Sequence, residues 1–147
     1  MVKNVLFDTS SLVATFLEDH PLHVASINWF QATLNDELKG YVSTHTLAEL
    51  YAVLTRMPRQ PRLSPLEVEQ LMCNLTSFEK VALSHSDYVK VIGRLVKLNL
   101  TGGVIYDALI AQAALVAEVE TLLTANSKDF LRLGEDVAAI VQPLLAK

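Results

Sequence analysis

The feature of the sequence that most constrains the fold is the alternation of short β-prone segments with longer stretches of helical periodicity. The β-prone segments lie at residues 2–7, 41–43, 80–83, 120–124 and 137–141. Between them, apolar residues recur three and four positions apart, as in helices that bury one face. Strands that alternate with helices pair in parallel through crossover connections, and the helices then cover both faces of the sheet. The sequence therefore predicts the α/β class, as a three-layer α/β/α sandwich around a mainly parallel sheet.

Capping residues and helix breakers set the expected helix boundaries. A first helix is expected after the polar cluster 8–11, and a second from 20 to 38 with Gly40 as its stop signal. The prolines at 58 and 61 end a helix that begins near Thr46. The run 64–67, Ser-Pro-Leu-Glu, predicts a capping box with proline at the first helical position. Further helices are expected at 84–98, 105–119 and 128–133.

The length and composition favour one globular domain over residues 1–147, because 51% of the residues are hydrophobic and 19% are charged. No uncharged run reaches the roughly 18 residues of a membrane-spanning helix, and no signal peptide is recognised, so we expect a cytoplasmic protein without membrane contact. The formal charge of -4 argues against non-specific coating of nucleic acid, although a local basic patch is allowed. The single cysteine, Cys73, is expected to be a small buried hydrophobe, which argues against redox chemistry.

Acidic and amide side chains stand where predicted strands end and predicted helices begin, namely Asp8, Glu49, Asp107, Asn126 and Asp129. Strand ends and the following helix starts gather along one edge of a parallel sheet, so we expect these side chains to meet in one cleft. Carboxylates within roughly 4–6 Å of one another repel, and a hard divalent cation is the usual remedy. The prospective ligands are all oxygen atoms, and no His or Cys accompanies them at a convincing spacing, which favours Mg²⁺ or Mn²⁺ over Zn²⁺.

Each of these residues taken alone also fits a helix-capping role. Asp8 is placed to cap the first helix, and the runs 46–49 and 126–129 each match a cap. Asp107 is expected in the first turn of a helix, where the helix dipole favours a carboxylate. Capping does not require the carboxylates to meet in space, so their convergence decides between the two interpretations.

Four segments, in this order, resemble the motifs of PIN-domain ribonucleases: VLFDTS at 5–10, TLAEL at 46–50, VIYDALIA at 104–111 and LTANSKDF at 123–130. Their order, their spacing and the chain length agree across nearly the whole sequence. Within this family the chain is most similar to the VapC toxins of toxin–antitoxin pairs. The resemblance implies a PIN-like fold and a Mg²⁺- or Mn²⁺-dependent endoribonuclease that hydrolyses RNA. It also implies a small cognate antitoxin and a homodimer.

The resemblance further implies roles for individual residues. Asp8, Glu49 and Asp107 are implied to bind the metal and to be catalytic, with a fourth acidic position in the last motif. Many PIN domains place an aspartate where Asn126 stands, so Asp129 ranks slightly ahead as the fourth catalytic acid, and both residues stay among the candidate metal ligands. The candidate hydrogen-bond donors that orient the carboxylates, with capping as the alternative role, are Thr9, Ser10 and Thr124.

Positive charge is needed beside an acidic site that holds a polyanion. The candidates lie at the end of the helix that carries Glu49 and in the loop after it, and are Arg56, Arg59 and Arg62. They are expected to contact RNA phosphates or the antitoxin. The pair His20 and His23 lacks a third and fourth metal ligand, so we expect it at a helix start or on the surface.

A second class of function stays open, that of a non-catalytic PIN-like module that binds RNA or protein and whose acidic site has degenerated. The neutral amide of Asn126 is the feature that favours it. A receiver-like phosphoacceptor domain is disfavoured, because no paired acidic residues precede Asp8.

Overall fold

Five parallel strands form the central sheet of the computed structural model, which describes residues 2–145. The strands are ordered β3-β2-β1-β4-β5, and every pairing between neighbours is parallel. Their bounds are β1 (Lys3–Phe7), β2 (Leu38–Ser43), β3 (Glu79–Val81), β4 (Thr121–Thr124) and β5 (Val141–Pro143). The predicted α/β class with a parallel sheet is therefore confirmed.

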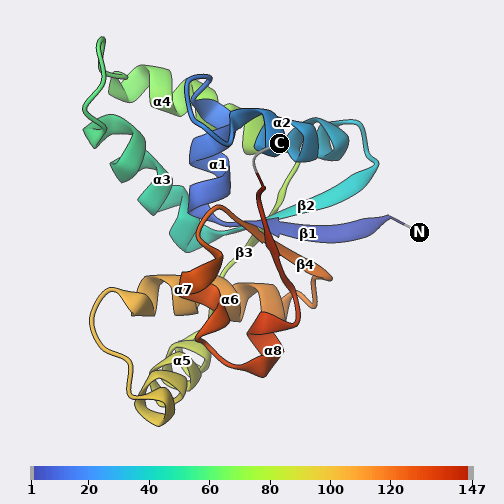
Figure 1. Cartoon of the computed structure of the whole chain (residues 1–147), viewed down its shortest axis with the longest axis vertical. Coiled ribbons are helices and arrows are strands. Elements are labelled where there is room, and N and C mark those ends of the chain that lie inside the picture. The colour runs from blue at the N-terminus through green and yellow to red at the C-terminus, as the bar shows by residue number, and fades with distance from the viewer. Residues whose placement is uncertain (1, 146–147) are drawn as a thin grey trace.

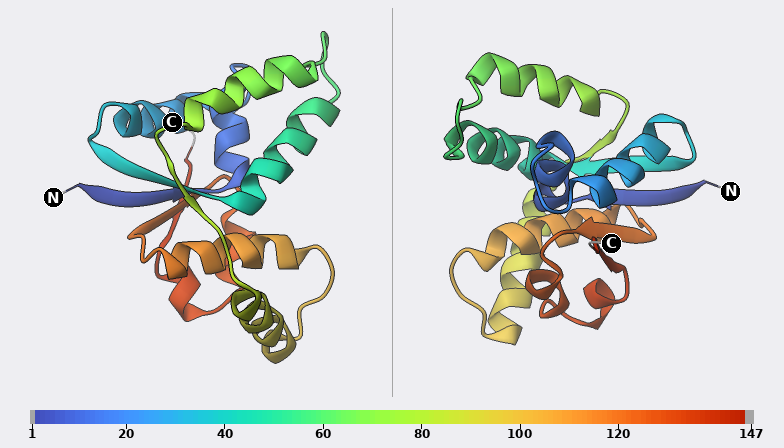
Figure 2. Two further views of the ribbon diagram at one scale, coloured as in Figure 1. Left: turned by 180° about the vertical axis from the view of Figure 1, so that it is seen from behind. Right: turned by 45° about the horizontal axis from the view of Figure 1, so that its top comes forward.

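Helices cover both faces of the sheet, with the first half of the chain on one side and the second half on the other (Figures 1 and 2). One side holds α1 (Thr9–Phe16), α2 (His23–Leu34), α3 (Thr44–Arg56), α4 (Pro65–Met72) and the short 3₁₀ helix η1 (Cys73–Leu75). The other side holds α5 (His85–Leu98), α6 (Val104–Val116), α7 (Ser127–Leu131) and α8 (Glu135–Ala138). Within residues 2–145, none of these helices has the length and apolar character needed to cross a membrane.

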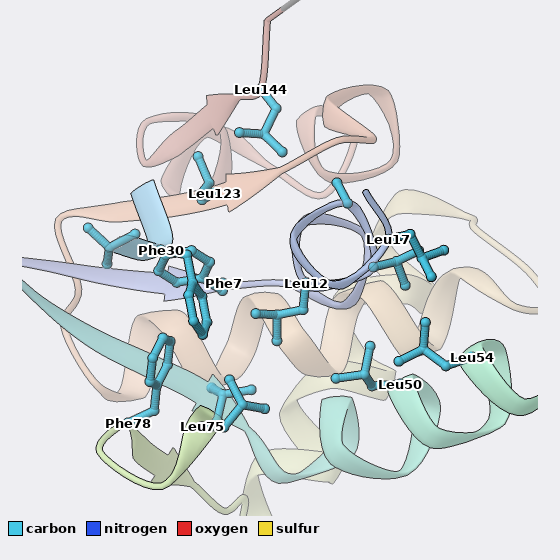
Figure 3. Close-up of a cluster of buried hydrophobic side chains, with 14 of the residues drawn as sticks. Phe7, Leu12, Leu17, Phe30, Leu50, Leu54, Leu75, Phe78, Leu123 and Leu144 are labelled. Carbon is cyan, nitrogen blue, oxygen red and sulfur yellow. The ribbon is translucent and has the colours of Figure 1, made fainter. Parts of the chain in front are cut away.

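The alternation of side chains along β1 divides the core into two clusters. Val5 and Phe7 face the α1–α4 side, whereas Leu6 packs with α5 and α6 on the other side, and all three are fully buried. On the first side, Phe7 lies edge-on to Phe30 and Phe78, with ring centroids 6.1 and 5.4 Å apart (Figure 3). Because residues 5–7 of β1 bury side chains on both faces, this part of the strand is a continuous apolar run, and its burial helps to fix the register.

The order of the strands creates a crevice between β1 and β4. The chain leaves β1 toward β2 on one side, and it returns to β4 on the other side only after β3. Ligands of open parallel sheets bind at such a switch point, beyond the carboxyl ends of the strands. The residues that directly follow β1 and β4 are therefore placed where a site is expected.

Two predicted helices are shorter in the structure. The helix expected over 20–38 is α2, which ends at Leu34 because the chain turns through Asp36 with φ 62°. Gly40 does not stop a helix but lies inside β2, where a Cβ would come within 2.6 Å of Thr33 Cγ2 and 2.8 Å of Phe78 Cε2. The helix expected over 105–119 ends at Val116, before Glu118 turns the chain with φ 55°.

Two further expectations are wrong. The closing β segment expected at 137–141 is divided between α8 and β5, since Val137 is buried from a helical turn and Asp136 is held by a bidentate ion pair with Arg94. Cys73 is exposed in η1 rather than buried. By contrast, the capping box of Ser64 and Glu67 at α4 forms as predicted.

Candidate active site

A cavity of about 500 Å³ lies beyond the carboxyl ends of β1 and β4. Its acidic wall contains Asp8 from the end of β1, Glu49 from α3 and Asp107 from the first turn of α6. Asn126, which follows β4, lines the same cavity. The structure thus brings together four of the five polar residues singled out in the sequence. Helix capping alone does not require this convergence.

Asp8 caps a helix and faces the cavity at the same time. It is only 3% exposed, and its Oδ1 accepts a hydrogen bond of 2.8 Å from the Ser11 backbone N–H at the start of α1. Its own N–H donates to Leu123 O, which extends the pairing of β1 with β4. Burial raises the pKa of Asp8 to about 6, although its hydrogen bonds act in the opposite direction.

Two hydroxyl groups orient the Asp8 carboxylate. Thr124 Oγ1 donates to Oδ2 at 2.6 Å, and Ser10 Oγ lies 2.9 Å from both carboxylate oxygens. Each hydroxyl oxygen also accepts a backbone N–H at 2.9 Å, from Asn126 and Ala125 respectively. These accepted bonds leave the hydroxyl protons to point at Asp8, so the predicted orienting contacts of Ser10 and Thr124 are present.

Glu49 is held by Thr9 rather than by a capping box. Thr9 Oγ1 donates to Glu49 Oε1 and lies 3.2 Å from Thr46 Oγ1. The capping box expected at 46–49 is wrong, because Ser43 caps α3 by accepting from His45 N at 3.1 Å. Thr46 is buried within the first turn of the helix. Glu49 is therefore not used by the helix end and lines the cavity.

Asp107 carries the most perturbed charge of the site. Burial first, and then the negative charges of Asp129, Asp8 and Glu49, raise the pKa of its carboxyl to about 7, although the positive charge of Arg132 acts in the opposite direction. Within residues 2–145, no hydrogen bond to the Asp107 carboxylate offsets these effects. Burial and three acids thus outweigh the one positive charge that acts on Asp107, and pKa shifts of this kind concentrate at functional sites.

The last motif places Asn126 in the cavity wall and Asp129 beside it. Asn126 occupies the N-cap position of α7, but its side chain makes no capping hydrogen bond. Asp129 lies in the first turn of α7, 3.7 Å from Arg132, and is not among the residues that line the cavity. Its negative charge nevertheless acts on Asp107, because among the neighbouring charges that of Asp129 raises the Asp107 pKa most.

The oxygen-only donor set fits a hard divalent cation. Among residues 2–145, no three acidic, histidine or cysteine side chains enclose a single ion position. Mg²⁺ does not need such a cage, because it keeps several waters and binds through one or two carboxylates together with substrate phosphate. Burial raises the pKa of Asp8, and burial together with neighbouring acids raises that of Asp107, so a bound cation would favour the charged form of both carboxyls. The residues present therefore fit the metal that the sequence motifs imply.

Sequence reasoning missed an apolar wall and an aromatic contact. His20, Pro21 and Leu22 line the same cavity as the acids, together with Val13 and Val53. No local pattern in the sequence predicts that the loop before α2 folds back to this position. Beside the acids, His45 of α3 stacks on Tyr106 of α6 with ring centroids 5.2 Å apart and planes at 1°. This contact joins the helices that carry Glu49 and Asp107.

The predicted arginine cluster does not line the cavity. Arg59 is half-buried, lies 3.9 Å from Asp19, and shares a separate hollow with Glu18 and Glu67. Arg56 and Arg62 are exposed at the end of α3 and in the loop after it. Any role for these side chains therefore lies outside the acidic pocket.

Comparison with known proteins connects this geometry to one family. The chain is 34% identical over 108 residues to Ribonuclease VapC27 of Mycobacterium tuberculosis, covering 73% of this chain and 74% of that protein. It is also 34% identical over 115 residues to Ribonuclease VapC40 of the same species, covering 78% and 81% of the two chains.

Solved structures share the fold at lower sequence identity. A chain in the crystal structure of VapBC2 from Rickettsia felis bound to a promoter DNA fragment superposes with a TM-score of 0.68 at 20% identity, covering 95% of this chain and 98% of that one. A chain in a toxin–antitoxin complex from Klebsiella pneumoniae gives 0.66 at 16% identity, covering 97% and 99%. Asp8, Glu49, Asp107 and Asn126, one residue from each of the four motifs, line one cavity. Residues 5–136 match the family model described as PIN domain, and the chain therefore belongs to the PIN-domain family.

Proposed function

We propose that this protein is a cytoplasmic, metal-dependent endoribonuclease of the VapC type, the toxin of a toxin–antitoxin pair, with residues 1–147 as one domain. The observation that carries the proposal is the meeting of Asp8, Glu49 and Asp107 in one cavity. The curated relatives at 34% identity are named as VapC ribonucleases, which supports the same activity here.

Mg²⁺ or Mn²⁺ is the proposed cofactor, with Asp8 and Asp107 as its principal ligands and Glu49 as a ligand or as the group that positions the attacking water. Asn126 and Asp129 complete the acidic site, the first through its side-chain oxygen and the second through its charge. When bound, such an ion activates water and neutralises charge on the phosphoryl oxygens.

The chain's own residues prepare the site for in-line attack of water on a phosphodiester bond. Ser10, Thr124 and the Ser11 N–H fix the Asp8 carboxylate in one orientation before substrate arrives. Thr9 holds Glu49 through Oε1, whereas Oε2 lies 3.9 Å from His45 Nε2, beyond hydrogen-bond distance, and can accept a hydrogen bond from water. The resemblance implies products with a 5′-phosphate and a 3′-hydroxyl.

RNA cleavage by purified protein tests the proposal. Wild-type protein is expected to cut single-stranded RNA with Mg²⁺ or Mn²⁺ and to stop on addition of EDTA, whereas Asp8→Ala and Asp107→Asn are expected to lose cleavage while remaining folded. Glu69→Gln removes an exposed carboxylate on α4 and serves as the control. Full activity in either site variant refutes the proposed ligands. RNA binding by the wild type without any metal-dependent cleavage instead supports a degenerate binding module.

A small antitoxin and a second copy of the chain are the proposed partners, and the three arginines outside the cavity are proposed contacts for RNA or antitoxin. The solved neighbours include a toxin–antitoxin complex, which supports the first partner. Expression of the chain alone is expected to arrest growth, and coexpression with the neighbouring small gene is expected to relieve the arrest. Light scattering of the purified chain then measures whether it is a dimer.

A further inference from the structure

The cavity that holds the acids also has an apolar wall that takes no part in the proposed hydrolysis. With the imidazole of His20, this wall comprises Val13 of α1, Val53 of α3 and the loop residues Pro21 and Leu22, and Ile110 and Ala125 line the same cavity. The loop is held by backbone hydrogen bonds of 3.0 Å, from His20 N to Leu17 O and from His23 N to His20 O. This wall is therefore a preformed part of the pocket.

One hydrogen bond fixes the chemistry that His20 presents. The backbone N–H of Leu22 donates to His20 Nδ1 at 3.0 Å. A ring nitrogen that accepts a hydrogen bond carries no proton, so the proton of the neutral imidazole is on Nε2. His20 is thus held by its own loop as a hydrogen-bond donor through Nε2.

The neighbouring histidine does not turn this loop into a metal site. His23 Nδ1 is paired with Ala14 O at 2.9 Å, and His23 does not line the cavity. Among the described residues that line the cavity, His20 is therefore the one histidine, and apolar side chains share this lining with it. A neutral ligand group with a flat apolar face and a hydrogen-bond acceptor at its edge suits this environment.

We propose that the apolar wall of the cavity binds a nucleobase of the RNA, on a nucleotide that flanks the scissile phosphate, and that His20 Nε2–H donates to an acceptor on that base. This inference rests on the proposed function. The acids and the apolar wall line one cavity of about 500 Å³, within the usual size of a small-ligand site, so a phosphate at the acids leaves an adjoining base facing Pro21 and Leu22. His20 is then a specificity-determining residue, because a base without a suitably placed acceptor leaves the donor unpaired.

Two substitutions distinguish the roles of the two ring nitrogens of His20. His20→Asn puts an oxygen near the place of Nδ1, so it keeps an acceptor for the Leu22 N–H and removes the Nε2 donor. His20→Gln extends an amide N–H toward the place of Nε2 and keeps a donor for the base. His85→Asn makes the same change on an exposed histidine at the start of α5 and serves as the matched control.

The assay is cleavage of a random single-stranded RNA pool with Mg²⁺, followed by sequencing of both product ends. Wild type and His85→Asn are expected to share one base preference beside the cut. His20→Asn is expected to reduce that preference roughly 3- to 10-fold, the effect of one lost hydrogen bond, and to spare the rate on disfavoured bases. His20→Gln is expected to retain part of the preference. Replacing the preferred base by an abasic nucleotide is expected to slow the wild type but to slow His20→Asn much less.

A second readout does not depend on turnover. In ¹⁵N spectra of the metal-free protein, the His20 ring is expected to show the Nε2–H tautomer. Titration with the four nucleoside 5′-monophosphates is expected to shift the Nε2 resonance most for the base that cleavage prefers.

The outcomes are distinguishable. RNA cleavage with the same flanking-base preference in wild type and His20→Asn refutes the base subsite and leaves the proposed nuclease intact. An equal loss from the abasic nucleotide in both proteins refutes the proposed hydrogen bond between His20 and the base. A wild type that cuts no RNA with Mg²⁺ or Mn²⁺ refutes the proposed function and this inference together.

Discussion

Replacing Asp107 with Asn in the metal-free protein is expected to stabilise the fold at alkaline pH. The wild-type carboxyl ionises with its ordinary pKa of 3.8 in the unfolded chain, whereas burial and the neighbouring acids raise the folded value to about 7. Folding therefore becomes less favourable as the pH rises through this window, because the unfolded state releases its proton first. Asn keeps the shape of the side chain but carries no charge.

The size of the effect follows from the shift in pKa. A rise of about 3 units corresponds to about 4 kcal/mol of unfolding free energy above pH 7. Asp107 is only half-buried, so solvent screening reduces the expected gain to about 2 kcal/mol. For a domain of this size, that gain raises the melting temperature by roughly 4–8 °C.

Urea and thermal unfolding of wild type and Asp107→Asn in EDTA, from pH 4 to pH 8.5, measure the difference. The stabilisation is expected to be small near pH 4, where the folded carboxyl is protonated and the unfolded one is only partly ionised, and to reach its full size above pH 7. Mg²⁺ is expected to stabilise the wild type and to have little effect on Asp107→Asn, which reverses the order of stability.

Asp87→Asn is the matched control with the opposite sign. Asp87 also lies in the first turn of a helix, but its pKa is lowered by hydrogen bonds from Ser84 and Gln112. The stability that it contributes is present above its unfolded pKa and is lost as the pH falls through its folded pKa. If Asp107→Asn destabilises the metal-free protein at pH 8, as Asp87→Asn is expected to do, the helix-dipole role of Asp107 outweighs the repulsion and the reasoning is refuted.

Three other predictions concern contacts in the site and the core. Thr124→Val removes a hydrogen bond that lowers the Asp8 pKa, so the acidic limb of the pH–rate profile of cleavage is expected to move to higher pH. An unmoved limb would show that this contact does not set the Asp8 pKa. Thr9→Val removes the hydrogen bond that holds the Glu49 carboxylate. In a Mg²⁺ titration of cleavage, this change is expected to weaken the apparent Mg²⁺ affinity roughly 10- to 100-fold. An unchanged midpoint of the Mg²⁺ titration would exclude Glu49 from the metal site. Gly40→Ala places a Cβ within 2.6 Å of Thr33 Cγ2 and is expected to lower the free energy of unfolding in urea by about 1–3 kcal/mol. Unaltered stability would show that α2 can shift away from β2.

Asp8 and the run 46–49 each fit both a helix cap and an acidic site in the sequence. The side chain of Asp8 both caps α1 and lines the cavity, so the two interpretations of the sequence describe one residue correctly. The run 46–49 matches a capping box equally well, yet Ser43 supplies the cap and Thr46 is buried against Thr9. A local pattern identifies residue types able to cap a helix, but the position of the first helical turn depends on where β2 ends.

Contacts with distant elements also explain why some predicted boundaries of helices and strands are wrong. Gly40 has the local character of a helix stop, but it is required inside β2 because the Phe78 ring packs against it. The segment 137–141 is as apolar as a strand, but Val137 is buried from a helical turn in α8. In both cases a contact with a distant element selects the conformation.

The sequence by itself determined the α/β class, the parallel sheet and the acids that follow its strands, because periodicity and strand–helix alternation are local properties that the backbone converts directly into layers. Only the tertiary structure decided that Asp8, Glu49, Asp107 and Asn126 line one cavity, and that the loop at His20 forms its apolar wall. Those placements depend on the strand order, which puts β1 beside β4 across more than a hundred residues of chain. The raised pKa values of Asp8 and Asp107 depend in turn on the burial of these side chains. Burial and proximity are properties of the packed chain, and no segment carries them alone.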